Sequence, residues 1–171
     1  MIIQFYKINK LVFIKKIIYE SKKLSKAVIT IEIVLLDLTY KDKEYYSLYY
    51  EAKIDTITPH KEGFVVEDRD LISFLEEKLD ILGLNYKERQ EFIIYWLPIL
   101  QNNKYNYIYF ETNVNDIYPI SVNPKPDTEI RILMEYLPLK DKIQVPEQEL
   151  CKVQRQGFTL VEWGGTRIYN K

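Results

Sequence analysis

The chain of 171 residues is poor in the residue types that most catalytic and metal-binding motifs require. It contains one cysteine, Cys151, and one histidine, His60. A single cysteine cannot form an intramolecular disulfide, which excludes a small disulfide-stabilised scaffold. One cysteine and one histidine cannot supply the four ligands of a structural zinc site. We therefore expect no metal.

Glycine is also scarce, and its distribution argues against nucleotide binding. The five glycines stand at positions 63, 83, 157, 164 and 165. A phosphate-binding loop needs clustered glycines so that backbone N–H groups can approach the anion. The sequence contains neither a P-loop nor a dinucleotide-binding pattern. We expect no nucleotide and no other cofactor.

Long hydrophobic runs are absent as well. No stretch of 18 apolar residues occurs, so we expect no transmembrane segment, and a soluble, cytoplasmic protein is favoured. The apolar cluster at 11–14 is interrupted by Lys15 and Lys16, which makes it too short for a signal-peptide core. Residues 1–30 nevertheless carry seven lysines against one acid. They could form a basic amphipathic segment, a targeting peptide, or an ordinary strand or helix entry.

The candidates for catalysis are few. His60 and Cys151 are the only histidine and cysteine, and nothing in the sequence brings them together, so we expect His60 to face solvent and assign no catalytic residue. The acids Glu76 and Glu77 are typical of the solvated face of an amphipathic helix. Glu111 and Glu162 fall on predicted strands and could line a groove, which leaves a carboxylate-type hydrolase as an alternative.

The hydrophobic pattern indicates an α+β fold. Period-two alternation predicts strands within 28–38, 45–53, 105–110, 130–136 and 158–163, with a short strand at 64–66. We expect an antiparallel, β-sandwich-like or curved sheet of about six or seven strands with a central two-helix insert. In the strand at 130–136 the even positions are predicted to face inward, and Arg131 and Glu135 outward. Residues 1–44 form a basic N-terminal segment with a first strand, and 45–171 form a single module.

The two helices carry clear boundary signals. Leucines at 71, 75, 79 and 82 form one helical stripe that Gly83 is placed to end. Asn85 and Glu88 resemble a capping box that opens the second helix. Pro98 is expected to kink or stop that helix.

Aromatic residues are the main excess in the composition, with 15 tyrosines. Tyrosine and tryptophan are enriched at binding hot spots, although they also fill cores and cover sheets. Six of them are candidate partner-binding residues: Tyr95, Trp96, Tyr105, Tyr107, Tyr109 and Trp163. The segment after Lys104 has too few basic residues for nucleic-acid binding, which we do not expect.

The pair Gly164–Gly165 admits two interpretations. We favour a two-residue hairpin turn that lets residues 167–169 pair back along residues 160–162. The alternative is a ubiquitin-like precursor that is processed after Gly165, with the last six residues as a removable extension.

Several motifs, taken as a set, resemble a family of microbial modules. They are Glu91-Phe-Ile-Ile-Tyr-Trp-Leu-Pro98, Pro124-Lys-Pro-Asp-Thr-Glu-Ile-Arg131 and Gly157-Phe-Thr-Leu-Val-Glu-Trp-Gly-Gly165. The resemblance covers roughly residues 45–165, and the family has no established activity. It implies only that these residues form the folded module.

The sequence as a whole favours a non-catalytic binding or interaction module. Its expected partner is a protein or a glycan, recognised through a surface rich in tyrosine and tryptophan. Whether the tyrosines are exposed or buried is the observation on which this hypothesis depends.

Overall fold

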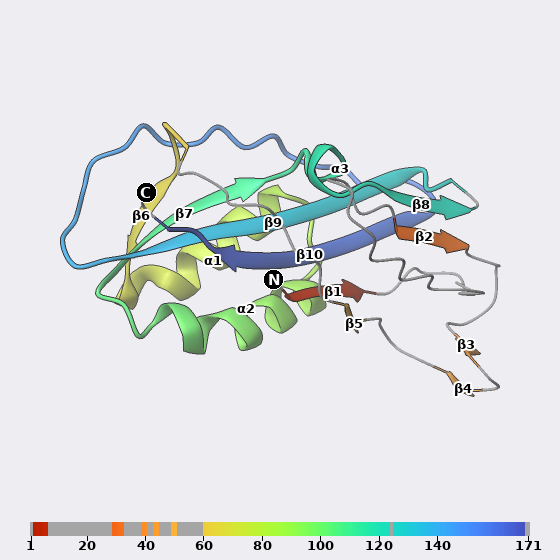
Figure 1. The fold of residues 1–171 in the computed structure, drawn as a ribbon, viewed down its shortest axis with the longest axis horizontal. Coiled ribbons are helices and arrows are strands. Elements are labelled where there is room, and N and C mark those ends of the chain that lie inside the picture. Colours follow the sequence, from red (N-terminus) through yellow and green to blue (C-terminus); the bar gives the residue numbers. More distant parts are fainter. Residues whose placement is uncertain are drawn as a thin grey trace, which may run out of the picture.

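A six-stranded sheet with the order β5-β1-β10-β9-β7-β6 forms the centre of the fold (Figure 1). The computed structural model describes residues 2–6, 29–32, 39–40, 43–44, 49–50, 60–123 and 125–169. The strands of the main sheet are β1 (Ile2–Tyr6), β5 (Tyr49–Tyr50), β6 (Phe64–Glu67), β7 (Tyr105–Glu111), β9 (Thr128–Leu139) and β10 (Thr159–Arg167). Two small sheets pair β2 (Ile29–Glu32) with β8 (Ile120–Asn123), and β3 (Thr39–Tyr40) with β4 (Lys43–Glu44).

The predicted mixture of helices and sheet is confirmed, whereas the sandwich-like form and the strand number of the whole chain stay predictions. The expectation of antiparallel pairing needs one correction in the main sheet. β10 runs parallel to β9, while the other neighbours in this sheet are antiparallel. Parallel neighbours need a crossover of a dozen or more residues. Residues 140–158 supply it as an extended segment without a helix.

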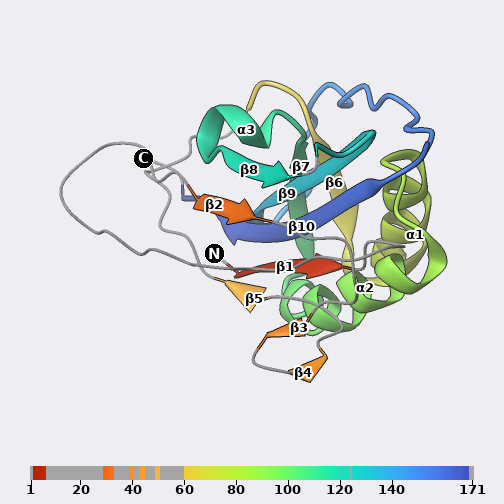
Figure 2. The same ribbon diagram turned by 90° about the vertical axis from the view of Figure 1, so that its right-hand side faces the viewer.

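Two helices cover one face of the sheet, and a third, short helix lies on the other side (Figure 2). After the 3-10 turn η1 (Asp68–Asp70) come α1 (Leu71–Ile81) and α2 (Tyr86–Leu100), and later α3 (Val114–Ile117). The core beneath α1 and α2 is apolar. It includes the leucines of the α1 stripe together with Phe92, Phe110, Ile132, Val161 and Trp163.

The predicted helix boundaries are confirmed at the connection between α1 and α2. Gly83 has φ +90°, a conformation that side chains disfavour, and its N–H donates to Asp80 O while Leu84 N donates to Leu79 O. Asn85 accepts from the N–H of Glu88, and the Glu88 carboxylate accepts from the N–H of Asn85. This is the capping box read from the sequence. Pro98 lies inside α2, which ends two residues later at Leu100.

The predicted hairpin turn at Gly164–Gly165 is wrong. Both glycines lie inside β10, paired with Leu133 and Met134 of β9 on one side and with β1 on the other. A Cβ on Gly165 would lie 2.6 Å from Cζ2 of Trp96 and 3.0 Å from the Met134 carbonyl oxygen. Glycine is therefore required here by a close approach of the α2 tryptophan to the strand, and not by a turn.

Several N-terminal predictions fall largely outside the described residues. β2 lies within the strand predicted at 28–38, and β5 within the one predicted at 45–53. Most of the basic segment at 1–30 belongs to the part of the chain that the structure does not describe. Its described portion, β1, pairs with both β5 and β10.

Candidate functional site

The six aromatic candidates do not gather on one surface. Trp96, Tyr107 and Trp163 are buried, with at most 4% of each exposed. The two tryptophans pack in the core between α2 and the sheet. Tyr95, Tyr105 and Tyr109 are half-buried. Tyr95 belongs to α2, whereas Tyr109 alternates with the core residue Phe110 and so lies on the opposite face of the sheet.

The face of the sheet away from α1 and α2 holds buried charges, among them Arg131 and Glu135, which the alternation predicted to face outward. Arg131 is 4% exposed and Glu162 is 1% exposed, and the Arg131 Nε donates to the Glu162 carboxylate across β9 and β10. The Arg131 Nη2 also donates to the Tyr118 carbonyl at 3.1 Å, and its guanidinium lies over the Tyr118 ring. The region of α3 therefore covers this part of the face and makes it a second interior.

A second polar cluster lies farther along the same face. His60 Nε2 is 3.0 Å from Glu135 Oε2, and Glu135 is 1% exposed. One ligand atom from each of His60, Glu111 and Glu135 lies within 4.8 Å of the other two. We call these three residues the His60 cluster. Its members come from the segment before β6, from the end of β7 and from the middle of β9.

The ladder between β7 and β9 explains why the two acids meet. Tyr109 is the register partner of Glu135, and Glu111 is the partner of Leu133. Glu111 and Glu135 are thus diagonal neighbours on one face, within reach of long side chains. The Glu111 Oε1 accepts a hydrogen bond from the Asn113 N–H at 2.6 Å.

Two tyrosines hold the histidine in position. The His60 ring stacks on the Tyr109 ring with centroids 3.6 Å apart and an interplanar angle of 11°. The Tyr107 hydroxyl donates to the Glu62 carbonyl at 2.6 Å, which fixes the segment that carries His60. The prediction that His60 faces solvent is therefore wrong in part, because its side chain is 30% exposed and directed at a buried carboxylate.

Burial dominates the electrostatics of this cluster. It raises the pKa of the Glu135 carboxyl above its ordinary value, while His60 lowers that pKa and the neighbouring Glu111 raises it further. Burial also raises the pKa of Tyr107 to about 12 and that of Tyr109 above its usual range. Both tyrosines consequently stay protonated near neutral pH and act as hydrogen-bond donors or ring surfaces.

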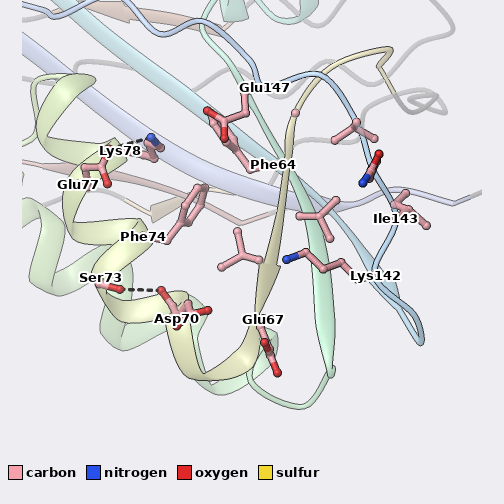
Figure 3. A pocket seen from close by; sticks show the side chains of 15 residues that line it. Phe64, Glu67, Asp70, Ser73, Phe74, Glu77, Lys78, Lys142, Ile143 and Glu147 are labelled. Atoms are coloured by element: carbon pink, nitrogen blue, oxygen red, sulfur yellow. Dashed lines mark hydrogen bonds and ion pairs between the residues drawn. The ribbon is translucent and has the colours of Figure 1, made fainter.

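A separate groove lies at the β6 edge of the sheet, between α1 and the segment at 142–147 (Figure 3). Its volume is about 590 Å³. β6 forms the floor, α1 forms one wall, and the segment at 142–147 forms the other. Phe64, Phe74 and Ile143 give it apolar surface. The charged lining residues are four acids and two lysines: Glu67, Asp70, Glu77, Glu147, Lys78 and Lys142.

The backbone of β6 faces this groove at alternate residues. The Asp68 N–H donates to Lys104 O on the β7 side, whereas the Gly63 N–H donates outward to Pro146 O at 2.9 Å. In an antiparallel ladder every second residue bonds the same neighbour, so the N–H and C=O of Val65 and Glu67 also point outward. Within the described residues, β6 has no ladder partner besides β7 apart from the single bridge between Gly63 and Glu147.

Comparison with known proteins identifies no relative. The chain matches no protein-family model, no curated protein and no solved structure. Among the helices that the structure describes, none has the length and apolar character needed to cross a membrane.

The sequence does not predict the His60 cluster, because no local pattern indicates that its three residues lie together. His60 and Glu135 are 75 residues apart in the chain. The sequence places Glu111 on a strand where it could line a groove, whereas the alternation predicts that Glu135 faces outward. The one usable signal was the Tyr107-Tyr109-Glu111 alternation, which places an acid on the same face as two tyrosines.

Proposed function

We propose that this protein is a non-catalytic interaction module that binds an extended segment of a partner protein by adding it as a strand to the edge of β6. The observation that carries the proposal is the outward backbone of Val65 and Glu67 in a groove between α1 and the 142–147 segment. Strand addition obtains affinity from main-chain hydrogen bonds and specificity from pockets for alternate side chains. We also propose that the whole chain completes the curved, sandwich-like sheet that the sequence predicts.

The lining of the groove supports a particular kind of peptide. Phe74 is half-buried and offers an apolar contact for one side chain of the segment, while the Phe64 ring, with its centroid 5.1 Å away, supports it from the core. Four acids outnumber two lysines in the lining, and Lys78 already donates to Glu77 at 2.8 Å. The expected segment is therefore apolar at alternate positions and carries lysine or arginine between them.

The burial of the acids weakens the case for the hydrolase alternative. Glu88 pairs with Arg155, Glu162 with Arg131, and Glu135 with His60. These are the three buried acids of the described residues. A glycosidase-type mechanism would need one of them to act as a proton donor toward a bound substrate.

The test begins with a displayed library of random 12-residue peptides selected on the full chain. Selected peptides are synthesised with a fluorophore, and their dissociation constants are measured by anisotropy. Replacing Val65 by proline removes the outward N–H without removing a β6–β7 hydrogen bond, and proline is tolerated on edge strands. Val65→Pro should weaken binding by about tenfold, since a lost hydrogen bond and a blocked edge together are worth about 1.4 kcal/mol or more.

Val65→Ala is the matched control, because it shortens the same side chain but keeps the N–H. It should bind within about twofold of the parent chain. The proposal fails if no peptide is enriched, if the proline variant binds as well as the alanine variant, or if glycans on an array bind while peptides do not. Turnover of a glycoside or ester panel by the chain would favour the hydrolase instead.

A further inference from the structure

We propose that the His60 cluster is a binding site for a divalent transition-metal ion of the Mn²⁺, Fe²⁺ or Zn²⁺ class. The site is built from one imidazole nitrogen and two carboxylate oxygens on the face of the sheet opposite α1 and α2. It is distinct from the groove at the β6 edge, because none of its three ligands lines that groove.

The ligand set determines the class of ion. Imidazole suits Zn²⁺, Fe²⁺ and similar ions, while carboxylate also suits Mn²⁺. Ca²⁺ and Mg²⁺ prefer an all-oxygen shell and would gain little from His60. Three protein ligands leave at least one coordination position for water or a substrate atom, as in metal sites that carry out chemistry.

The existing distances suit a bound ion with small movements. Two ligand atoms that are each about 2.1 Å from an octahedral ion lie about 3.0 Å apart. His60 Nε2 and Glu135 Oε2 are already 3.0 Å apart, and the Glu111 oxygen lies within 4.8 Å of both. Glu111 is half-buried at the end of β7 and can approach by rotating its side chain.

The surroundings show features that an ion would satisfy. Glu135 is 99% buried in the middle of a strand, and its one described hydrogen-bond partner is a member of the same cluster. A buried carboxylate beside a second carboxylate is costly unless a cation neutralises both. The stacking of His60 on Tyr109 and the Tyr107 bond to Glu62 hold the imidazole in place, which is the role of supporting residues around a metal.

The site is open to solvent, and within the described residues no second cluster of this kind competes with it. His60 retains 30% exposure, so an ion can enter from solvent without unfolding the sheet. Among the described residues it is the one group of at least three histidine, cysteine or acidic side chains with converging ligand atoms. Cys151 is exposed and belongs to the crossover, outside this cluster.

The experiment uses the untagged full chain, freed of metal by a chelator, in a Cys151→Ser background that removes an adventitious thiol ligand. Free Mn²⁺ is followed by its electron paramagnetic resonance signal during titration, and Zn²⁺ is then added as a competitor. We expect one Mn²⁺ per chain, displaced by Zn²⁺ and not by equal Mg²⁺ or Ca²⁺. Glu111→Gln should weaken binding by about tenfold or more, because an amide replaces an anionic ligand.

Glu129→Gln is the matched control, since Glu129 lies on the same strand and face as Glu135 but is exposed and outside the cluster. It should bind Mn²⁺ like the parent chain. Circular dichroism of each variant establishes that it is folded. Glu111→Gln is preferred to Glu135→Gln because Glu111 is half-buried, so its replacement disturbs the folded structure less than replacement of the buried Glu135.

The proposal is overturned if neither Mn²⁺ nor Zn²⁺ binds saturably, or if Glu111→Gln and Glu129→Gln bind alike. The cluster would then be an ion pair between His60 and Glu135 without a metal. Peptide binding at β6 is to be measured in the presence of a chelator, so that its success or failure is independent of this result.

Discussion

At the scale of single residues, Gly165 and Trp96 show how closely a helix side chain packs against a strand in this core. The α2 tryptophan lies against the β10 backbone with no space for a side chain between them. The other obstacle to a Cβ at this position is the Met134 carbonyl, which is part of the β9–β10 ladder and cannot move independently. Gly165, which together with Gly164 reads as a turn in the sequence, is therefore a packing feature of the core.

Gly165→Ala should destabilise the protein by about 1–3 kcal/mol, the usual cost of overpacking a filled core. Urea denaturation followed by tryptophan fluorescence measures the change. The same substitution in a Trp96→Phe background should cost less, because the ring atoms that the new Cβ would meet are absent. Equal costs in the two backgrounds would show that Trp96 is not the obstacle.

Single-residue patterns predicted the burial of apolar side chains well and that of charged ones poorly. The even positions of β9 face the core as the alternation predicted, but Arg131 and Glu135 on the odd positions are buried too. Period-two alternation reports only that the two faces differ. It cannot report that α3 and a segment before β6 will cover the second face, because those contacts join residues far apart in the chain.

At the scale of elements, the two helices could be predicted from local sequence, whereas the path of the crossover could not. α1 and α2 carry their own boundary signals in Gly83 and in the Asn85–Glu88 box, so local sequence sufficed to place them. The crossover at 140–158 carries no periodicity from which its path could be predicted. Its path is fixed by contacts with distant residues, and Arg155 makes three of them in its C-terminal half.

Arg155 fastens the crossover to the turn between the two helices. Its Nε donates to the Gly83 carbonyl at 2.7 Å, and both of its terminal nitrogens donate to the Glu88 carboxylate. Glu88 is 2% exposed, so removal of the guanidinium leaves a buried carboxylate with the Asn85 N–H as its described partner.

Arg155→Ala should therefore lower the free energy of unfolding by about 1–3 kcal/mol and increase amide exchange in residues 150–156. Hydrogen exchange read by mass spectrometry measures the local effect. Lys152→Ala is the control, since it removes a cation from the same segment at an exposed position. Similar exchange in both variants would mean that Arg155 does not hold the crossover.

At the scale of the whole molecule, the order of strands in the sheet differs from their order in the chain. β10, which follows the other described strands in the sequence, lies between β1 and β9, and β1 joins the rest of the sheet through β10, while the short β5 pairs with the outer side of β1. The pairing of β10 with β9 and that of β1 with β10 are among the most extensive contacts between described elements. Pairing that joins residues far apart in sequence makes folding slow, because the loop entropy is lost before the contacts form.

Pulse-labelled hydrogen exchange during refolding should accordingly show α1 and α2 protected first, and β1 protected no earlier than β10. The helices close through a turn of four residues, 82–85, whereas Ile2–Tyr6 must find Val161–Gly165. Protection of β1 amides before those of β10 would contradict the assignment of β10 as the strand that admits β1 to the sheet.

The central place of β10 also bears on how the protein is made. A ribosome releases β1 into solution long before residues 159–167 are synthesised, so the two strands cannot pair during most of translation. For that interval the apolar N-terminal strand is without its main partner in the sheet and is open to chaperones or to aggregation. The position of β10 in the sheet thus delays the pairing of β1 until residues 159–167 have left the ribosome.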